Sequence, residues 1–402
     1  MADLHSLPET PDFDAYPAER RVNRAHADGR SVRVTWDDGL ESRYHVFWLR
    51  ENSPEADVTN QDSREQHLQL VDIPDDLTAL TARAGAAGEL CVAWSTGQTS
   101  RYHPGWLRAY TDGAPEDQYA LPSRKTWDAG MADCLPCFDG AKLLGDQDGE
   151  RDRWAEALHV YGVAVIRELP VDPEMIFTVP SILGPVRPTN FGPVFDVRSR
   201  AGADVTSNAY TEMALPVHTD LCTREYKPGL QFLYCLDNSA DGGDSELADG
   251  FRIAEQVKAR EPEAFAALTT IPVAYYSKAT DSDYRWSKPM FALDELGDID
   301  EIRWSPWLRA PLRLPFDQVD RLYHGLRTAF RIGDEPGLKV RIKLKPGEML
   351  CFDNRRVLHG RLGYDPATGS RWMRGCYVER EELHSRLRIM ARQRRAAALV
   401  SP

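Results

Sequence analysis

Three side chains of the sequence have the types and the spacing of a metal-binding set. His218 and Asp220 lie two residues apart, and His359 follows much later in the chain. On an extended strand, residues i and i+2 project from the same face, so His218 and Asp220 can converge on one ion. Two imidazoles and one carboxylate form the facial set that holds non-haem Fe(II) and leaves coordination positions open. The alternative for the pair alone is a structural His and Asp joined by a hydrogen bond.

An arginine downstream of His359 extends this pattern. Arg371 follows in Gly369-Ser-Arg-Trp-Met-Arg-Gly-Cys-Tyr377. A guanidinium on a strand beside the last metal ligand can bind a carboxylate through two parallel N–H donors, as a dicarboxylic co-substrate such as 2-oxoglutarate requires. A surface arginine in an Arg-rich tail is the alternative for this residue taken singly. The four residues together predict an Fe(II)/2-oxoglutarate oxygenase whose catalytic residues are His218, Asp220, His359 and Arg371.

The composition limits the partners of the protein and its compartment. The chain has 402 residues, more than one hydrophobic core usually serves, which predicts two domains. A net charge of −13 argues against a nucleic-acid partner and fits a small cationic substrate better. The amino terminus lacks a basic region followed by an apolar run, and no stretch approaches the ~20 apolar residues that span a membrane. We therefore expect a cytoplasmic protein without a membrane partner.

The cysteines agree with this expectation. Seven cysteines, an odd number, are scattered through apolar stretches such as Leu233-Tyr-Cys-Leu236. This pattern is typical of reduced core residues in a cytosolic protein. Cys134 and Cys137 form a C-x-x-C pair, but no second pair accompanies them, so a redox or zinc role is the less favoured alternative.

A repeat occupies the first hundred residues. Val34-Thr-Trp-Asp-Asp-Gly39 and Ser42-Arg-Tyr-His45 return as Val92-Ala-Trp-Ser-Thr-Gly97 and Ser100-Arg-Tyr-His103. Each copy predicts a hairpin with a Gly-containing turn, followed by a short segment that contains Trp-Leu-Arg. Binding of a ligand by the repeat is the less favoured alternative to a structural role. The tryptophans of both copies are expected to fill the core of a small β-rich domain: Trp36, Trp48, Trp94 and Trp106.

The order of the segments predicts the domain organisation. We expect a tail over 1–18, a small β-rich domain over 19–113, a Pro-containing linker over 114–139 and a catalytic domain over 140–402. Apolar alternation and helical periodicity predict the following elements of the catalytic domain: strands over 162–167, 230–236 and 340–344, and helices over 150–161, 251–268, 316–330 and 379–398. Many short strands, with a long excursion inside the metal set, predict a fold that is mainly β with flanking helices, a distorted double-stranded β-helix or jelly roll.

Further segments around the metal motif carry a resemblance to a known family. They are Asn190-Phe-Gly-Pro-Val-Phe-Asp-Val-Arg198, Ser207-Asn-Ala-Tyr-Thr211, Cys222-Thr-Arg-Glu-Tyr-Lys-Pro-Gly229 and Gly242-Gly-Asp-Ser-Glu-Leu-Ala-Asp-Gly250. With these segments, the chain resembles the γ-butyrobetaine dioxygenase family of Fe(II)/2-oxoglutarate-dependent oxygenases. The likeness extends from the first hairpin to the terminal helix.

The resemblance implies roles for particular residues. It places His218, Asp220 and His359 on the iron and Arg371 on the distal carboxylate of 2-oxoglutarate. Leu233 and, less strongly, Ser245 are implied as contacts of that co-substrate. An aromatic cage for a trimethylammonium group is implied at Phe191, Phe195, Tyr210 and Tyr377. A quaternary ammonium has no N–H to donate, so ring faces select it, at roughly 0.5 to 2 kcal/mol for each ring.

The resemblance also implies a reaction and an assembly. The reaction is hydroxylation of γ-butyrobetaine at C3 to L-carnitine, with O2 as oxidant, succinate and CO2 as co-products, and ascorbate as reductant. The alternatives are the same hydroxylation of trimethyllysine or 2-trimethylaminoethylphosphonate, and a metal-binding jelly roll without turnover. A homodimer is expected. The helix over 379–398 is expected either to contribute to the subunit contact or to pack onto its own domain through Leu383, Leu387 and Met390.

The sequence departs from the family pattern in its amino-terminal domain. The family usually holds a structural zinc there on three cysteines and a histidine. Ser53, Glu55 and Val58 occupy the cysteine positions, and His103 occupies the histidine position. One ligand cannot hold zinc tetrahedrally, so structural zinc is not expected.

Two further departures concern the substrate. Trp304-Ser-Pro-Trp307 replaces a more polar segment that can orient the substrate carboxylate, which leaves the anionic end of the substrate open. Arg374 is a second arginine that could bind a sulfonate or phosphonate. Strand alternation argues against that role, because Arg371 and Tyr377 are an even number of residues apart and Arg374 falls on the other face.

Overall fold

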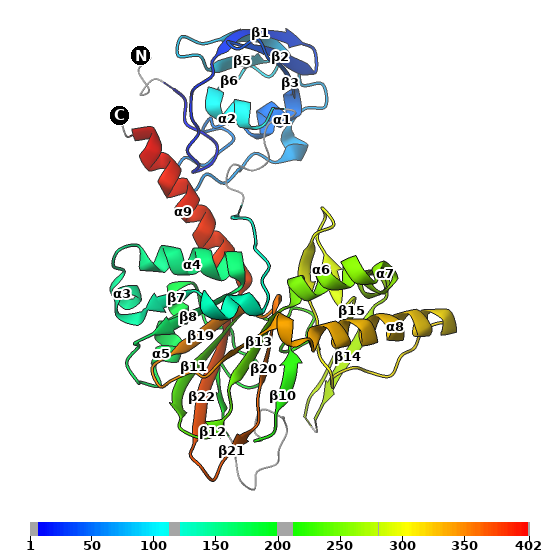
Figure 1. Ribbon diagram of the computed structural model, residues 1–402. Coiled ribbons are helices and arrows are strands. Elements are labelled where there is room, and N and C mark those ends of the chain that lie inside the picture. The colour runs from blue at the N-terminus through cyan, green and yellow to red at the C-terminus, as the bar shows by residue number, and fades with distance from the viewer. Residues whose placement is uncertain (1–6, 112–120, 199–211, 280, 401–402) are drawn as a thin grey trace. The chain divides into compact units, whose positions relative to one another are not determined.

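The computed structural model describes residues 7–111, 121–198, 212–279 and 281–400 (Figure 1). The chain forms two compact units, residues 1–120 with 389–402 and residues 121–388. Both are built mainly on strands with helices beside them, and the predicted fold class is confirmed. Among the described helices, none has the length and apolar character to cross a membrane.

The first unit contains two copies of a three-stranded meander followed by a short helix, with a 3-10 turn between them in sequence. The elements are β1 (Val22–Asp28), β2 (Ser31–Trp36), β3 (Glu41–His45), α1 (Val46–Glu51), η2 (Leu70–Asp72), β4 (Ala79–Ala84), β5 (Leu90–Trp94), β6 (Thr99–Tyr102) and α2 (Pro104–Ala109). Gly39 and Gly97 take φ of 83° and 90° in the equivalent turns of the two copies, a conformation that glycine adopts without a Cβ clash. The predicted hairpin repeat is present.

The tryptophans of the repeat pack in the core of the first unit. Trp36 and Trp94 are fully buried, and their indole N–H groups donate to the hydroxyls of Ser42 and Ser100 at 2.7 and 2.9 Å. The two bonds join equivalent residues of the two copies. Each one satisfies a donor that burial would otherwise leave without a partner.

A reciprocal pair of hydrogen bonds ties the two copies together. The Tyr44 hydroxyl donates to the Leu107 carbonyl at 2.9 Å, and the Tyr102 hydroxyl donates to the Leu49 carbonyl at 2.6 Å. Leu49 and Leu107 lie in the last turns of α1 and α2, where carbonyls have no partner within the helix. Each copy therefore satisfies the helix end of the other.

Two larger sheets form the roll of the second unit (Figure 1). Their orders are β10-β20-β13-β18 and β7-β8-β19-β11-β22-β9. The strands of the first sheet are β10 (Leu215–His218), β13 (Ser245–Asp249), β18 (Lys339–Ile342) and β20 (Val357–Arg361). Those of the second are β7 (Cys137–Asp139), β8 (Val163–Arg167), β9 (Val194–Val197), β11 (Leu230–Asn238), β19 (Met349–Asp353) and β22 (Arg371–Val378). A short ladder pairs β12 (Asp241–Gly242) with β21 (Tyr364–Asp365).

Apolar side chains of the two sheets pack against one another. One buried cluster joins Val163, Leu350 and Met373 of the six-stranded sheet to Leu247 and Val340 of the four-stranded sheet. Because inward and outward side chains alternate along each strand, polar residues on the same strands as these can reach the interior of the roll. Polar side chains on these strands can therefore meet between the two sheets.

Helices cover the six-stranded sheet, and a long insertion separates β13 from β18 (Figure 1). The helices of this unit that precede β9 in the sequence are η3 (Ala129–Asp133), α3 (Gly140–Gly145), α4 (Glu150–Tyr161), α5 (Met175–Thr178) and η4 (Pro180–Ile182). The insertion and the end of the chain contain α6 (Gly250–Arg260), α7 (Pro262–Thr270), β14 (Val273–Lys278), β15 (Asp283–Lys288), β16 (Phe291–Leu293), β17 (Ile299–Ile302), α8 (Phe316–Gly333), η6 (Pro336–Leu338) and α9 (Arg380–Val400).

The structure differs from the sequence predictions at two places and bears on a third that was left open. The helix expected over 251–268 is interrupted at Glu261, because Pro262 has no N–H to continue the first helix and begins α7 instead. The described part of the segment 114–139, expected as a linker, contains η3 and β7, and β7 pairs in parallel with β8. Leu383, Leu387 and Met390 of α9 are buried within the chain, which favours packing on the chain itself over a subunit contact.

Candidate metal centre and substrate site

The two candidate histidine ligands lie opposite each other on neighbouring strands. His218 is the last residue of β10 and pairs in register with His359 of β20. The spacing in the sequence predicts Asp220 on the same strand as His218. In the structure, Asp220 lies instead in the turn that follows β10. Leu221, next in that turn, has a φ of 55°, which a residue with a Cβ adopts at a cost of about 1 to 2 kcal/mol. The turn, not strand alternation, brings the carboxylate back toward the imidazoles.

The three side chains offer their ligand atoms to one point. Asp220 Oδ1 lies 3.2 Å from His218 Nε2 and 3.7 Å from His359 Nε2. One ligand atom from each of the three residues lies within 4.8 Å of the others, and no second group of His, Cys, Asp and Glu of this kind occurs among the described residues. Two imidazole nitrogens and one carboxylate oxygen so close together can bind a divalent transition metal and leave the rest of its coordination shell open.

A hydrogen bond and two pKa shifts bear on how these three side chains can bind a metal. His218 Nδ1 lies 2.9 Å from the Pro216 carbonyl, a contact in which Nδ1 donates and Nε2 is turned toward Asp220. Burial, followed by the electrostatic effect of His218, lowers the pKa of His359 to about 3, so this ring is neutral near pH 7. Burial acts to raise the pKa of Asp220, but His359, His218 and Tyr377 outweigh it and hold that pKa well below its usual range. His359 and Asp220 are therefore in the forms that bind a metal.

Asn354 fixes the backbone of the turn that carries Asp220. Its Oδ1 accepts from the Asp220 N–H at 2.7 Å, and its Nδ2 donates to the Asp220 carbonyl at 3.3 Å. Nδ2 also donates to the Pro228 carbonyl at 3.2 Å. Sequence reasoning missed this residue, although it lies in the segment Cys351-Phe-Asp-Asn354 that leads to His359. Asn354 satisfies both backbone groups of Asp220 in a position where strand pairing has ended.

Two of the four residues predicted for an aromatic cage lie together beside the metal ligands. The rings of Phe195, on β9, and Tyr377, on β22, have centroids 5.3 Å apart, and the Tyr377 hydroxyl donates to Asp220 Oδ2 at 2.7 Å. Phe191 lies in the preceding loop, 40% exposed, and in the described part of the chain no ring contact joins it to this pair. Tyr210 lies outside the described residues.

A third aromatic ring, which the sequence analysis did not place in the cage, lies against the metal set. The ring of Trp307 is 4.8 Å from that of His218, and Trp307 is 38% exposed. Phe352 contacts His359 at the same ring distance from within the core. Trp307 therefore forms part of the entrance to the candidate metal centre, at the segment where the sequence departs from the family pattern.

Arg371 presents an unsatisfied donor inside the roll. Its side chain is buried on β22, and Nε donates to the Gly243 carbonyl at 3.3 Å. Nη1 is buried and has no hydrogen-bond partner among the described residues. Burial, followed by the charge of Arg361, lowers the pKa of Arg371 to about 10, so the guanidinium remains charged at neutral pH. A buried cation with a free N–H group fits the carboxylate of a bound co-substrate.

Leu233 and Ser245 lie on strands that border the same interior. Leu233, on β11, pairs with Gly375 of β22, and its half-buried side chain packs in the cluster between the sheets. Ser245, on β13, pairs with Arg361 of β20, two residues after His359. Both residues are thus placed on strands next to those that carry His359 and Arg371.

Arg374 lies on the outer side of the six-stranded sheet. Its Nη1 donates to the Pro173 carbonyl at 2.9 Å, and its Nε lies 3.6 Å from Asp196 Oδ1. Its guanidinium also lies 6.0 Å from the Phe177 ring of α5. These contacts agree with the strand alternation argument that separates Arg374 from Arg371.

The positions of the family's zinc ligands have other contacts in this chain. The Ser53 hydroxyl donates to that of Ser100 at 2.8 Å, and Val58 is fully buried. His103 Nδ1 accepts from the N–H groups of Gly105 and Trp106 at 3.1 and 3.3 Å and caps α2. The zinc-free domain stays a prediction, and His103 has a structural task that does not involve a metal.

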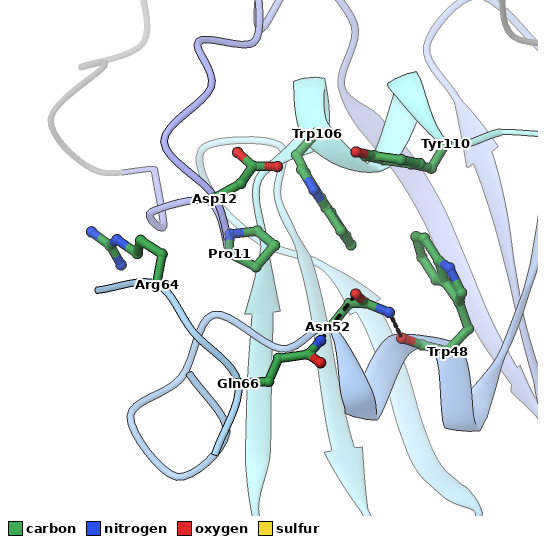
Figure 2. Close-up of a pocket in the computed structure, with 8 residues that line it drawn as sticks. All are labelled: Pro11, Asp12, Trp48, Asn52, Arg64, Gln66, Trp106 and Tyr110. Atoms are coloured by element: carbon green, nitrogen blue, oxygen red, sulfur yellow. Dashed lines mark hydrogen bonds between the residues drawn. The ribbon is translucent and has the colours of Figure 1, made fainter. Parts of the chain in front are cut away.

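Figure 2 shows a pocket of about 370 Å³ in the first unit. Its lining residues are Pro11, Asp12, Trp48, Asn52, Arg64, Gln66, Trp106 and Tyr110. Trp48 stacks on Trp106 at 5.1 Å and on Tyr44 at 5.6 Å. Trp106 also stacks on Tyr102 at 6.1 Å. Two rings cannot stack on one face, so other rings already cover the faces of both indoles, which are therefore not open to a cation.

The comparisons with known proteins agree with this geometry. The sequence pattern of the family described as taurine catabolism dioxygenase TauD, TfdA family matches residues 129–377. That match spans more than half of the chain. The chain belongs to the TauD, TfdA family of dioxygenases. It is a 2-oxoglutarate-dependent dioxygenase that uses Fe(II), and the enzyme class and cofactors predicted from the sequence are confirmed.

Relatives of this TauD, TfdA family member resemble it along almost all of its length. A pattern described as gamma-butyrobetaine hydroxylase-like, N-terminal, matches residues 23–108. Gamma-butyrobetaine dioxygenase of Pseudomonas sp. is 40% identical over 384 residues, which cover 95% of this chain and 99% of the relative. Trimethyllysine dioxygenase of Meyerozyma guilliermondii is 27% identical and covers 92% and 96%. Human gamma-butyrobetaine dioxygenase is 27% identical and covers 93% and 98%.

Proposed function

We propose that the protein hydroxylates γ-butyrobetaine at C3 to L-carnitine, with succinate and CO2 as co-products. We also propose that His218, Asp220 and His359 hold the iron. One observation carries the proposal: the ring of Tyr377 contacts that of Phe195 in a tilted arrangement, while its hydroxyl donates to Asp220. An aromatic surface suited to a quaternary ammonium is thereby in direct contact with a residue of the metal set. The 40% identity to a γ-butyrobetaine dioxygenase supports this choice of substrate.

In this reaction, the residues of the chain bind and orient the substrate and the co-substrate. When bound, Fe(II) and 2-oxoglutarate supply the oxidation of an unactivated C–H bond by O2. Arg371 provides a buried charged donor for the distal carboxylate of 2-oxoglutarate, and Leu233 and Ser245, on strands next to those of Arg371 and His359, are further proposed contacts. Phe195 and Tyr377, with Phe191 and Tyr210 as further proposed cage residues, bind the trimethylammonium group. Holding the cation at a fixed place relative to Asp220 selects which carbon lies near the iron.

Succinate release tests the proposal directly. Purified protein with Fe(II), ascorbate, O2 and 2-oxoglutarate is expected to release succinate faster when γ-butyrobetaine is present and to form L-carnitine in equal amount. His218→Ala and Asp220→Ala are expected to abolish both products, because each removes one of three metal ligands. Stimulation by trimethyllysine or 2-trimethylaminoethylphosphonate instead of γ-butyrobetaine would identify a different substrate. Succinate release at the wild-type rate in either variant would refute the metal assignment.

We further propose a cytoplasmic homodimer. The seven cysteines are free, and Cys222, Cys235, Cys351 and Cys376 are buried, which suits a reducing compartment. Light scattering coupled to gel filtration is expected to give twice the 45.4 kDa of the chain. A mass of one chain at micromolar concentration would contradict the dimer.

A further inference from the structure

We propose that the Tyr377 hydroxyl is a positioning group for the metal, because it holds the Asp220 carboxylate with one particular oxygen turned toward the two imidazoles. This role differs from the contribution of the Tyr377 ring to substrate binding. The inference rests on the metal set of the proposed function and is independent of which substrate the enzyme oxidises.

The two oxygens of Asp220 have different partners. Oδ2 accepts from the Tyr377 hydroxyl at 2.7 Å. Oδ1 lies 3.2 Å from His218 Nε2 and 3.7 Å from His359 Nε2. One oxygen of the carboxylate, Oδ1, therefore faces the ligand nitrogens, and the other, Oδ2, accepts a hydrogen bond from the phenol. A hydrogen bond to a charged acceptor is stronger than one between neutral groups and stabilises this arrangement.

The hydroxyl and Asn354 restrain different parts of Asp220. Asn354 binds the N–H and the carbonyl of Asp220 and so fixes its backbone. The side-chain torsions of Asp220 stay free to rotate under that restraint, and the bond from Tyr377 removes this freedom. Tyr377 comes from the six-stranded sheet, whereas Asp220 follows β10 of the other sheet. The bond therefore crosses the interior of the roll and joins the two halves of the site.

The phenol that donates this hydrogen bond is buried. Tyr377 is 3% exposed, so its hydroxyl is held at Asp220 and is largely removed from solvent. A carboxylate can bind a metal through one oxygen or through both. Holding Oδ2 on the phenol favours binding through Oδ1 alone, which leaves one more coordination position for 2-oxoglutarate and O2.

Metal affinity without turnover tests this role. Binding of Mn(II), a stable substitute for Fe(II), is measured by the loss of its free electron paramagnetic resonance signal in wild type and in Tyr377→Phe. The Phe variant keeps the ring and loses only the donor. We expect a Kd that is about 10- to 100-fold higher, the range found for residues that orient metal ligands. A Kd within twofold of wild type would overturn the proposal.

Two controls separate this result from other causes. Tyr234→Phe removes a buried phenol that donates to the Pro170 carbonyl, on the neighbouring strand β11, and is expected to leave the Mn(II) Kd unchanged. Equal weakening in both variants would indicate general destabilisation and would also refute the proposal. His359→Ala is expected to lose tight Mn(II) binding. If it binds as wild type does, the metal set itself is wrong, whatever Tyr377→Phe shows.

A graded donor provides a second test that does not require the Phe variant to fold. Incorporation of 4-aminophenylalanine at position 377 keeps the ring and places an N–H donor, weaker than the phenol, at the same position. The proposal predicts a Kd between those of wild type and Tyr377→Phe, or several-fold above wild type if the Phe variant does not fold. A Kd equal to that of wild type, or one as high as in Tyr377→Phe, would contradict it.

Discussion

At the scale of the residue, the site depends on polar atoms that the protein itself leaves without partners. The Arg371 Nη1 group has no partner among the described residues, although the side chain is buried. Leaving a buried charged donor unsatisfied costs more than about 1 to 3 kcal/mol. Such a cost is tolerated where a ligand supplies the missing acceptor. A carboxylate of 2-oxoglutarate is the acceptor that we propose for Arg371.

The first prediction concerns this guanidinium. Arg371→Lys keeps the positive charge but loses the planar pair of donors, so the KM for 2-oxoglutarate is expected to rise about 10- to 100-fold. Initial rates of succinate formation at varied 2-oxoglutarate measure the change. Arg374→Lys, three residues away on the other face of the strand, is the matched control and is expected to keep the wild-type KM. Equal effects of the two substitutions would contradict the assignment.

At the scale of the element, the register between β9 and β22 creates the aromatic surface. Gly375 pairs with Phe195, and a Cβ at Gly375 would lie 2.4 Å from the Phe195 ring. The absence of a side chain at this position leaves room for the Phe195 ring beside the strand. There the ring contacts that of Tyr377, two residues further along β22, with centroids 5.3 Å apart. A single glycine thus decides whether two neighbouring strands present one continuous aromatic face.

A second prediction follows for Gly375→Ala. The added methyl group must displace the Phe195 ring, so the KM for the trimethylammonium substrate is expected to rise about fivefold, in line with the loss of one ring contact of about 1 kcal/mol. Mn(II) affinity is expected to stay near that of wild type, because Asp220 keeps its bond to Tyr377. Steady-state kinetics and Mn(II) titration of the same preparation measure both. An unchanged KM would show that Phe195 does not contact the substrate.

At the scale of the whole molecule, the second unit buries neutral histidines as well as charged pairs. His159 and His384 contact each other with ring centroids 5.3 Å apart. Burial, followed by the charge of Arg124, lowers the pKa of His159 to about 4. Burial, followed by Arg380, lowers the pKa of His384 to about 3. In the unfolded chain both rings titrate near ~6.5.

These lowered pKa values determine how the free energy of unfolding changes with pH. Between pH ~6.5 and the folded pKa values, the unfolded chain binds more protons, so the free energy of unfolding falls as the pH falls. Each histidine contributes at most about 1.4 kcal/mol per pH unit. Guanidinium unfolding of metal-free protein is therefore expected to show lower stability at pH 5.0 than at pH 7.5. His384→Gln is expected to lose less stability over this range than wild type does. The surface variant His26→Gln is the control and is expected to lose as much stability as wild type.

The fold and a large part of the site were predictable because their signals are local. Trp36 and Trp94, with the Gly39 and Gly97 turns, indicated the repeat, since period-two patterns and turn residues act over a few positions. The spacings of His218 with Asp220 and of His359 with Arg371 indicated the metal set and the arginine, whereas the role of Tyr377 was implied only by the family resemblance. The break at Pro262 was also legible in the sequence, but helical periodicity on both sides of the proline obscured it.

The remaining features depend on contacts between distant segments. The sequence by itself determined which residues are able to bind iron and a dicarboxylate, because residue type fixes charge, donors and acceptors. Only the tertiary structure decided that Asp220 reaches the imidazoles through a turn clamped by Asn354, and that the Tyr377 hydroxyl meets Asp220 Oδ2. These bonds join residues more than a hundred positions apart. Their geometry is fixed by the packing of two sheets, which no short stretch of sequence encodes.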